Sequence, residues 1–394
     1  MTIQGLPAGA TSAPGAYVHV PFCAHRCAYC SFVALEGRSE EDRFFEGVEK
    51  EIRSRENEAV GGLRGFDSVY FGGGTPSYVD ARHLRRLLGT LEEVFGLSSD
   101  VEITAEANPD DLDGGKLRAF REIGVNRLSV GVQSLVDEEL LPLERRHDAS
   151  AARRSVEEAS RLFENVSADL MIGIPGQTRE SLRTSVEGLL EAGISHLSVY
   201  LLEIEKAPRL VRLRTDRPDL FADDDEMADR WLEVDERLEA SGLPRYEISN
   251  WARPGFESRH NLKYWTLVPV LGFGVAAHSF DGRRRSANTG SLAEYLRLTL
   301  QSLSPIATSE ENGEDFLRRK EGLMLGLRLA SGVLSSSFEE IRCSLPAAEA
   351  SRLRDAFDAG LLETVGEAGG RAGRRVRLTR KGVLLSNEVF ALFL

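Results

Sequence analysis

The chain has 394 residues, of which 42% are hydrophobic and 28% charged, and a formal net charge of −13. This length exceeds what one simple core supports, so we expect two or three domains, and the hydrophobic content excludes wholesale disorder. The acidic balance excludes broad attraction to nucleic acid or to anionic membranes, so no nucleic-acid partner is expected.

Residues 1–15 have no basic flank and no sustained apolar run, which predicts a disordered leader and not a signal peptide. No stretch of 18 apolar residues occurs, so no transmembrane segment is expected. Only four cysteines are present, and three fall within eight residues. That pattern favours metal ligation in a reducing compartment over a disulfide framework, so we expect a cytoplasmic protein.

Six strand-like runs alternate with amphipathic helical segments, the first of which opens with a Ser39-x-x-Asp42 capping pattern. Such alternation predicts a parallel sheet. Six units are too few for a closed eight-stranded barrel. We therefore predict an α/β fold with an open, TIM-like partial (βα)6 barrel over residues 16–225, and a doubly wound sheet is the competing topology. The strands are expected at Ala16–Phe22, Ser68–Phe71, Val101–Ala105, Arg127–Gly131, Ala168–Ile174 and His196–Leu201.

The rest of the chain divides into further segments. Residues 208–225 are polar and acidic, which predicts a connecting loop. Residues 226–307 begin with a helical pattern and continue as an extension rich in aromatics, glycines and histidines. Residues 308–394 predict helices followed by a basic strand pair around a glycine-rich turn, typical of an α+β, winged-helix-like domain. Packing or dimerisation is favoured for this domain over nucleic-acid binding.

Three cysteines follow the first predicted strand as Cys23, Cys27 and Cys30, in a C-x3-C-x2-C run. Thiolates are the usual ligands of iron–sulfur clusters, and three on one loop can hold three irons of a [4Fe–4S] cubane and leave the fourth open. A zinc site is the alternative, with a nearby histidine as the fourth ligand that it needs. Cys343 lies far away in sequence and is expected to be an ordinary buried thiol.

Further short motifs lie at or just beyond the ends of predicted strands. Together with YVHVPFC and the cysteine run, they resemble the radical-SAM superfamily, and in particular its HemN/HemW branch, over nearly the whole chain. The resemblance implies a site at the carboxyl ends of the strands, where an open iron chelates the methionine end of S-adenosylmethionine. The motifs are GGGTPS (Gly72–Ser77), AEANP (Ala105–Pro109), RLSVGVQS (Arg127–Ser134), ADLMIGIPGQT (Ala168–Thr178) and HNLKYW (His260–Trp265).

The resemblance also assigns S-adenosylmethionine contacts. The loop with Gly73, Gly74 and Thr75 is expected to contact the methionine amino group, although a tight βα turn would also use glycine. Glu106 is expected to accept hydrogen bonds from the ligand, with a helix cap as the alternative. Three polar residues match positions that hold a second S-adenosylmethionine in relatives, and the alternative is that they form ordinary salt bridges. Two tyrosines are expected beside the cluster and the adenine, and the alternative is that they belong to the core. These residues are Gln133, Arg145 and Asp169, and Tyr17 and Tyr29.

One position departs from the pattern of the coproporphyrinogen dehydrogenases in that branch. Those enzymes carry a further cysteine two residues past the third ligand, where this chain has Phe32. The difference argues against decarboxylation of coproporphyrinogen III. It favours the haem-chaperone members, which have a hydrophobic residue at this position.

The resemblance implies a haem site at the HNLKYW segment, with His260, Asn261, Tyr264 and Trp265 as its residues. Imidazole is a common axial ligand of haem iron, and the two aromatic side chains offer flat apolar surface. The alternative is that His260 and Asn261 only hydrogen-bond neighbouring loops above an aromatic mini-core. The cations expected to pair with haem propionates are Arg253, Arg259 and Lys263.

These expectations combine into a function. We expect a haem chaperone that binds haem, a [4Fe–4S] cluster and S-adenosylmethionine and delivers haem to apoproteins, with a reductant for the cluster as a further partner. The alternative is a radical-SAM oxidoreductase acting on a porphyrin, such as oxygen-independent coproporphyrinogen III oxidase. The sequence fixes neither the cleavage of S-adenosylmethionine nor an oligomeric state.

Overall fold

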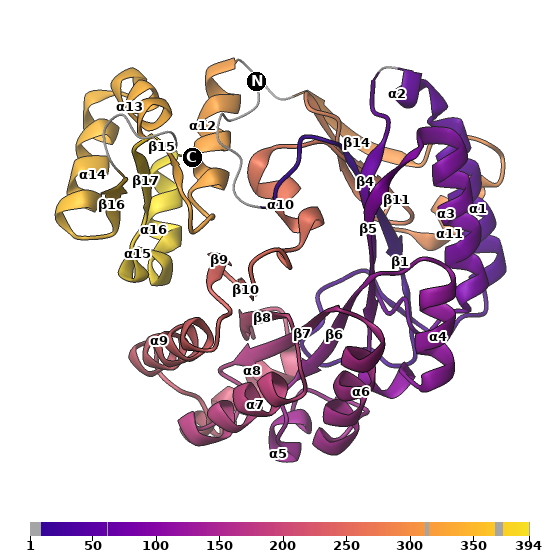
Figure 1. Ribbon diagram of the computed structural model, residues 1–394, viewed down its shortest axis with the longest axis horizontal. Coiled ribbons are helices and arrows are strands. Elements are labelled where there is room, and N and C mark those ends of the chain that lie inside the picture. Colours follow the sequence, from indigo (N-terminus) through magenta and orange to yellow (C-terminus); the bar gives the residue numbers. More distant parts are fainter. Residues whose placement is uncertain (1–8, 61, 312–314, 367–372, 394) are drawn as a thin grey trace.

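The computed structural model describes residues 9–60, 62–311, 315–366 and 373–393. A twelve-stranded sheet curls into an open barrel with helices on its outer face (Figure 1). The predicted α/β class and TIM-like partial barrel are therefore confirmed. In order across the sheet, the strands are β14 (Ile306–Glu311), β13 (Arg284–Asn288), β12 (His278–Phe280), β11 (Val270–Phe273), β1 (Gly15–Val20), β4 (Phe66–Gly73), β5 (Leu97–Ala107), β6 (Arg127–Gln133), β7 (Asn165–Ile172), β8 (His196–Leu201), β10 (Asn250–Ala252) and β9 (Arg245–Glu247).

The six predicted strands form the parallel part of this sheet, from β1 through β4 to β8. A seventh parallel strand, β11, pairs with the other side of β1, and β10 runs antiparallel to β8. The sequence did not predict β11, because its four residues lie in a glycine- and aromatic-rich stretch without strand periodicity. The barrel is thus wider than six units.

Helices connect the parallel strands and bury their apolar stripes against the sheet. α3 begins after Asp80, whose side chain accepts a hydrogen bond from Arg82 N. The predicted Ser39 cap is wrong, because α1 begins at Glu41 and its N-cap residue Glu40 makes no side-chain capping bond. The helices of this region are α1 (Glu41–Ser54), α2 (Glu56–Val60), α3 (Ala81–Phe95), η1 (Pro109–Asp111), α4 (Gly114–Glu122), α5 (Asp137–Leu140), α6 (Ala149–Leu162) and α7 (Arg179–Glu191).

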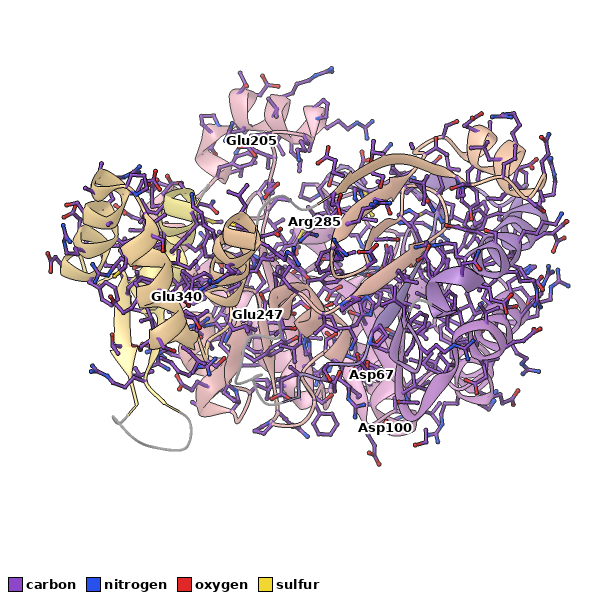
Figure 2. The ribbon with its side chains drawn as sticks, turned by 90° about the horizontal axis from the view of Figure 1, so that it is seen from above. Asp67, Asp100, Glu205, Glu247, Arg285 and Glu340 are labelled. Atoms are coloured by element: carbon purple, nitrogen blue, oxygen red, sulfur yellow. The ribbon has the colours of Figure 1, made fainter. Side chains whose placement is uncertain are left out.

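Residues 208–225 are largely helical, which corrects the predicted loop. They form α8 (Pro208–Asp216), the 3-10 turn η2 (Pro218–Leu220) and the start of α9 (Asp224–Ala240). Proline suits the first position of a helix, and only Leu210 of α8 is buried. The polar composition misled the prediction because α8 is mostly exposed; in Figure 2 the part of the chain labelled at Glu205 stands off the barrel.

The end of the chain forms a separate three-stranded sheet in the order β15-β17-β16, which agrees with the predicted α+β class of this region. The glycine-rich turn predicted between β16 and β17 lies outside the described residues. Within the described ranges, no helix is long and apolar enough to cross a bilayer. The remaining elements are α10 (Arg259–Thr266), α11 (Leu292–Thr299), α12 (Asp315–Gly326), β15 (Val333–Leu334), α13 (Ser335–Ser344), α14 (Ala347–Asp358), β16 (Leu362–Val365), β17 (Arg375–Leu378), α15 (Arg380–Leu384), α16 (Ser386–Phe390) and η3 (Ala391–Phe393).

A buried ion pair fastens the N-terminal segment to the barrel. Lys263 Nζ, on α10, donates to Asp67 Oδ1 of β4 at 2.5 Å and to Ala13 O at 2.7 Å. The side chains of Lys263 and Asp67 are 1% and 6% exposed. Residues 1–8 of the predicted leader lie outside the described residues, but residues 9–14 pack beside this pair, and Gly15 already belongs to β1.

Removing one partner of this pair is expected to destabilise the protein strongly. Lys263→Met leaves the Asp67 carboxylate buried without its cation, which should lower the free energy of unfolding by about 3–5 kcal/mol in urea denaturation. Lys50→Met is the matched control, because it removes a partly exposed pair with Glu46, and should cost less than about 1 kcal/mol. Equal losses in the two variants would contradict a structural role for the buried pair.

Candidate functional site

The carboxyl ends of β1 and of β4 to β7 lie at one edge of the barrel, because these strands are parallel. The chain leaves β1 into the cysteine loop, where β2 (Phe22–Cys23) pairs with β3 (Leu35–Glu36). Thr75 N donates to Phe22 O at 2.8 Å and Gly37 N donates to Cys23 O at 2.9 Å. The loop is therefore fixed against the end of β4.

Two of the three sulfur atoms in this loop accept hydrogen bonds from other loops of the site. Thr75 Oγ1 donates to Cys23 Sγ at 3.3 Å, and Arg145 Nη1 donates to Cys27 Sγ at 3.3 Å. Cys30 N donates to Cys27 O at 3.1 Å, which closes a turn between these two cysteines. Hydrogen bonds to sulfur are a recognised means of tuning thiolate ligands.

The four thiols differ in burial: Cys23 is buried, Cys27 and Cys30 are partly exposed, and Cys343 is exposed. Burial raises the pKa of Cys23 to about 11, so this thiol needs a bound metal to lose its proton at neutral pH. Cys343, predicted to be buried, is instead exposed. α13 turns Phe338 and Ile341 into the core, and position 343 lies off that buried face.

The donor geometry does not favour the zinc alternative. In the ranges that the structure describes, no three His, Cys, Asp or Glu side chains gather closely enough to hold one metal ion. His19 Nδ1 lies 3.1 Å from Tyr17 OH and its Nε2 lies 2.8 Å from Val33 O, so both ring nitrogens have partners. His25 lies 3.0 Å from a Glu36 carboxylate oxygen. A cubane, by contrast, takes one thiolate on each of three irons.

Close contacts within the chain account for the glycines that end β4. A Cβ atom on Gly73 would come within 2.5 Å of the His19 ring, and one on Gly74 within 2.7 Å of the Val20 carbonyl oxygen. Gly73 also has a φ of 109°, which L-residues rarely adopt. Packing against β1 therefore explains these glycines without a ligand.

Glu106, at the end of β5, is held by two donors. Tyr70 OH donates to Oε1 at 2.8 Å, and Gly73 N donates to Oε2 at 3.0 Å. Desolvation by burial, with a smaller contribution from the nearby Asp169 carboxylate, raises the pKa of Glu106 to about 7. The alternative role of a helix cap does not fit, because the N-cap residue of η1 is Asn108.

Arg145 reaches from the loop after α5 to the cysteine loop. Its Nη2 donates to Asn108 Oδ1 at 2.7 Å, and its Nη1 lies 3.4 Å from Tyr29 OH. Arg145 Nε and Gln133 Oε1 are buried and have no hydrogen-bond partner in the described part of the chain. Buried polar atoms without partners are costly, so both suit contacts with a bound ligand.

Asp169 and Arg127 bring opposite charges into the same interior. Desolvation raises the pKa of Asp169 to about 6, and Ser129 Oγ lies 3.5 Å from its Oδ1. Arg127 is 2% exposed, and its positive charge lowers the pKa of both Asp169 and Glu106. Arg127 was not predicted as a site residue, although an arginine that opens the buried strand RLSVGVQ was an available signal.

His260 lies at the start of α10 beside the amino-terminal half of β4, not beside the cysteine loop. It is 1% exposed, with Nδ1 3.1 Å from Ser68 Oγ and Nε2 3.0 Å from Tyr264 OH. The ring centroids of Tyr70 and Tyr17 lie 5.1 and 6.3 Å away. Burial lowers the pKa of His260 to about 3, so the imidazole is neutral. Tyr17 was predicted either beside the cluster and the adenine or in the core, and its ring centroid lies 6.1 Å from that of His19 and 6.3 Å from that of His260.

The other predicted haem residues differ in accessibility. Tyr264 is 41% exposed, and Asn261 N donates to the N-cap oxygen of Ser258 at 3.3 Å. Trp265 is half-buried, with the Arg328 guanidinium 4.2 Å from its ring centroid. Tyr264 thus presents the open aromatic face of α10.

Two of the three cations predicted to pair with haem propionates form ion pairs within the protein. Lys263 is committed to Asp67, and Arg259 pairs with Asp100 at 3.0 Å, so protein carboxylates already hold both cations. Figure 2 shows Asp67 and Asp100 on the same side of the molecule. Arg253 is exposed.

Comparison with known proteins agrees with this geometry. A family model described as the radical SAM superfamily matches residues 17–189. A heme chaperone HemW of Bacillus subtilis is 36% identical over 384 residues, which cover 96% of this chain and 98% of that protein. The chain belongs to the HemW family of radical-SAM proteins. Another HemW, from Mycobacterium tuberculosis, is 35% identical over 95% of this chain and 93% of its own.

A solved structure supports the fold of this HemW-family chain along its length. Coproporphyrinogen III oxidase (HemN) from Escherichia coli, a radical SAM enzyme, superposes with a TM-score of 0.80 at 22% identity. The superposition covers 97% of this chain and 90% of that chain. At this identity the likeness establishes the fold alone.

The raised pKa of Glu106 predicts a pH-dependent penalty in the iron-free protein. Between the ordinary value near 4.5 and about 7, the folded state keeps a proton that the unfolded state releases, so stability falls as pH rises through this window. Glu106→Gln removes the titration. From pH 5 to pH 8, urea denaturation should show wild type losing about 2–3 kcal/mol relative to the variant.

Glu93→Gln serves as the control for this measurement. Glu93 is exposed, and its hydrogen bond from Arg53 lowers its pKa, so it is ionised throughout that range. A constant difference between wild type and Glu106→Gln at both pH values would contradict the raised pKa.

Proposed function

We propose that this protein is a haem chaperone that holds a [4Fe–4S] cluster on Cys23, Cys27 and Cys30, binds S-adenosylmethionine beside it, and carries haem to acceptor proteins. The observation that carries the proposal is one loop with three thiols, bordered by buried polar groups that lack partners. It stands in a chain that matches heme chaperones over nearly its full length.

The cysteine loop fits a cluster in its donor set. Three of the four cysteines of the chain lie on this one loop, and Thr75 and Arg145 donate hydrogen bonds to two of their sulfur atoms. Together with S-adenosylmethionine, a bound cluster supplies one-electron chemistry. The roles of the protein are to position the ligands and to keep water from them.

The polar groups around the loop suit a zwitterionic ligand. The Glu106 and Asp169 carboxylates can accept hydrogen bonds from an amino group. The unpaired Arg145 Nε can donate to a carboxylate, and the unpaired Gln133 Oε1 can accept from a ribose hydroxyl. Gly73, Gly74 and Thr75 form the wall next to Cys23, and Tyr29 lies beside Arg145. These residues are our proposed S-adenosylmethionine seat.

His260 is the proposed axial ligand of haem, with the rest of the HNLKYW segment as its surroundings. Its neutral imidazole is the form that binds iron. Its Nε2 becomes available when the hydroxyl of Tyr264 moves away, and the exposed ring of Tyr264 is the first surface that a porphyrin meets. Haem binding in this arrangement therefore requires a local rearrangement.

Iron content tests the cluster. Anaerobically reconstituted wild type should hold about four irons per chain, and the triple Cys23→Ala, Cys27→Ala, Cys30→Ala variant almost none. The matched control is Cys343→Ala, which removes an exposed thiol on α13 and should leave the iron unchanged. Iron retained in the triple variant would overturn the assignment. Conversion of coproporphyrinogen III by the reconstituted protein would favour the oxidoreductase alternative.

Haem titration tests His260. His260→Ala should weaken haem binding by roughly tenfold or more and change the haem spectrum, with the cluster iron retained. Tyr264→Phe keeps the ring but removes the hydroxyl on Nε2, so it should bind haem at least as well as wild type. His278→Ala, on an exposed position of β12, is the control. A wild-type spectrum and affinity in His260→Ala would refute ligation by this residue.

A further inference from the structure

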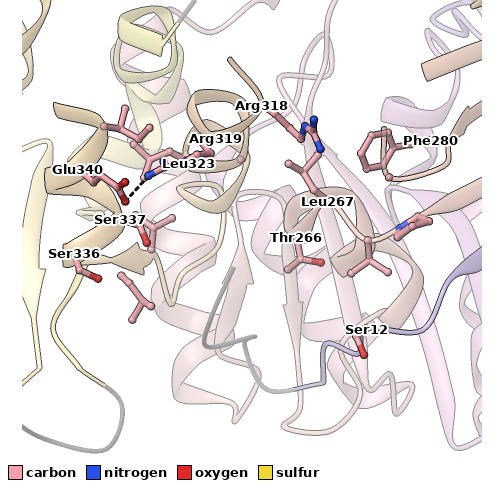
Figure 3. A pocket seen from close by; sticks show the side chains of 17 residues that line it. Ser12, Thr266, Leu267, Phe280, Arg318, Arg319, Leu323, Ser336, Ser337 and Glu340 are labelled. Carbon is pink, nitrogen blue, oxygen red and sulfur yellow. Dashed lines mark ion pairs between the residues drawn. The ribbon is translucent and has the colours of Figure 1, made fainter. Parts of the chain in front are cut away.

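A cavity of about 590 Å³ lies where the end of α10 and the β11–β12 region face α12 and α13 (Figure 3). This volume is in the range of small-molecule sites. Its walls combine apolar side chains from the barrel extension and from the C-terminal helices. They are Leu267, Val268, Pro269 and Phe280 on the first side, and Leu323, Val333, Leu334 and Ile341 on the second.

Two arginines of α12 differ in how their charge is neutralised. Arg319 forms an ion pair with Glu340 across the cavity wall (Figure 3). Arg318 forms no ion pair with an acidic residue in the described part of the chain, and its Nε is buried without a hydrogen-bond partner. In Figure 3 the Arg318 guanidinium extends over Leu267 toward Phe280. Among the described residues, an arginine without an acidic partner therefore borders the apolar wall of this cavity.

Leu267 shows that the backbone is shaped at this point. It ends α10 with a φ of 53° and a ψ of 33°, the left-handed conformation that favours glycine. A leucine in that conformation carries a strain of about 1 kcal/mol or more, and it places an apolar side chain in the cavity wall. Part of the cavity wall, at Leu267, is therefore formed by a strained backbone conformation.

The lining carries no strong iron ligand. Among the described residues that line the cavity, none is a histidine, cysteine or methionine. A ligand here would be held by apolar contact and by pairing with a guanidinium. Its affinity should not depend on a metal ion.

We propose that this cavity binds an apolar molecule bearing a carboxylate, with the carboxylate on Arg318. Two sources share this chemistry: a porphyrin ring with its propionates, and a long-chain fatty acid. The site is separate from the one proposed at His260, since Thr266 follows His260 by six positions along α10, about 9 Å of helix. It does not depend on the haem-chaperone function.

The test measures binding of metal-free protoporphyrin IX, haem and palmitate to the full-length protein. Arg318→Met keeps the apolar stem and removes the charge, and Ser337→Trp fills the cavity from α13 without removing a core side chain. The matched controls are Arg183→Met, on an exposed arginine of α7, and Ser344→Trp, at the exposed far end of α13. Arg318→Lys retains a cation and should keep part of the affinity.

We expect at least one of the two metal-free ligands to bind wild type. Arg318→Met should weaken that binding by roughly tenfold to a hundredfold, Ser337→Trp should abolish it, and both controls should bind normally. Protoporphyrin binding would identify the porphyrin as the source, and palmitate binding alone would identify the acyl chain. His260→Ala should leave both unchanged.

Failure of both metal-free ligands to bind wild type, or binding that both cavity variants retain, would overturn the proposal. Haem lost in His260→Ala but retained in Arg318→Met and Ser337→Trp, with palmitate and protoporphyrin unbound, would refute the cavity while leaving the proposed function intact. Haem binding that is retained in His260→Ala and in both cavity variants would instead refute ligation of haem by His260.

Discussion

The parallel pairing of β1 with β4, and of β4 through to β8, is the constraint on which the site depends. Parallel strands end on the same edge, so motifs spread from residue 23 to residue 169 reach one place. The cysteine loop has no element of its own beyond the short β2–β3 pair. Its position follows from backbone bonds to β4, and a change in strand order would separate the thiols from Arg145 and Glu106.

Desolvation gives this interior its chemistry. Burial raises the pKa of Glu106 to about 7 and that of Asp169 to about 6, and it lowers that of His260 to about 3. Arg127 and Arg145 offset part of the carboxylate charge. The folded chain thus holds polar groups that are costly without a ligand, and this cost favours binding of a ligand that completes their hydrogen bonds.

α10 connects two distinct environments. Its first residues turn His260 toward the aromatic interior of the barrel, and Lys263 anchors the helix through Asp67. Its last residues, Thr266 and Leu267, face the cavity beside the C-terminal helices. One short helix therefore links the proposed haem ligand to a second, apolar surface. Movement at Tyr264 would act on a helix whose other end borders that surface.

Local patterns were sufficient for the parallel strands, for the family and for most of the residues near the cysteine loop, because strand alternation and motif order are properties of neighbouring residues. They were insufficient for α8, for β11 and for the exposure of Cys343. These three features depend on which face of a helix or strand packs against residues that are distant in sequence. The same reason explains why the carboxylate partners of Lys263 and Arg259 were not predicted, because Asp67 and Asp100 lie more than 150 residues away in sequence. Only the tertiary structure could show that His260 is enclosed by Ser68 and Tyr264, because desolvation and occupancy of a ring nitrogen depend on side chains that the fold brings together.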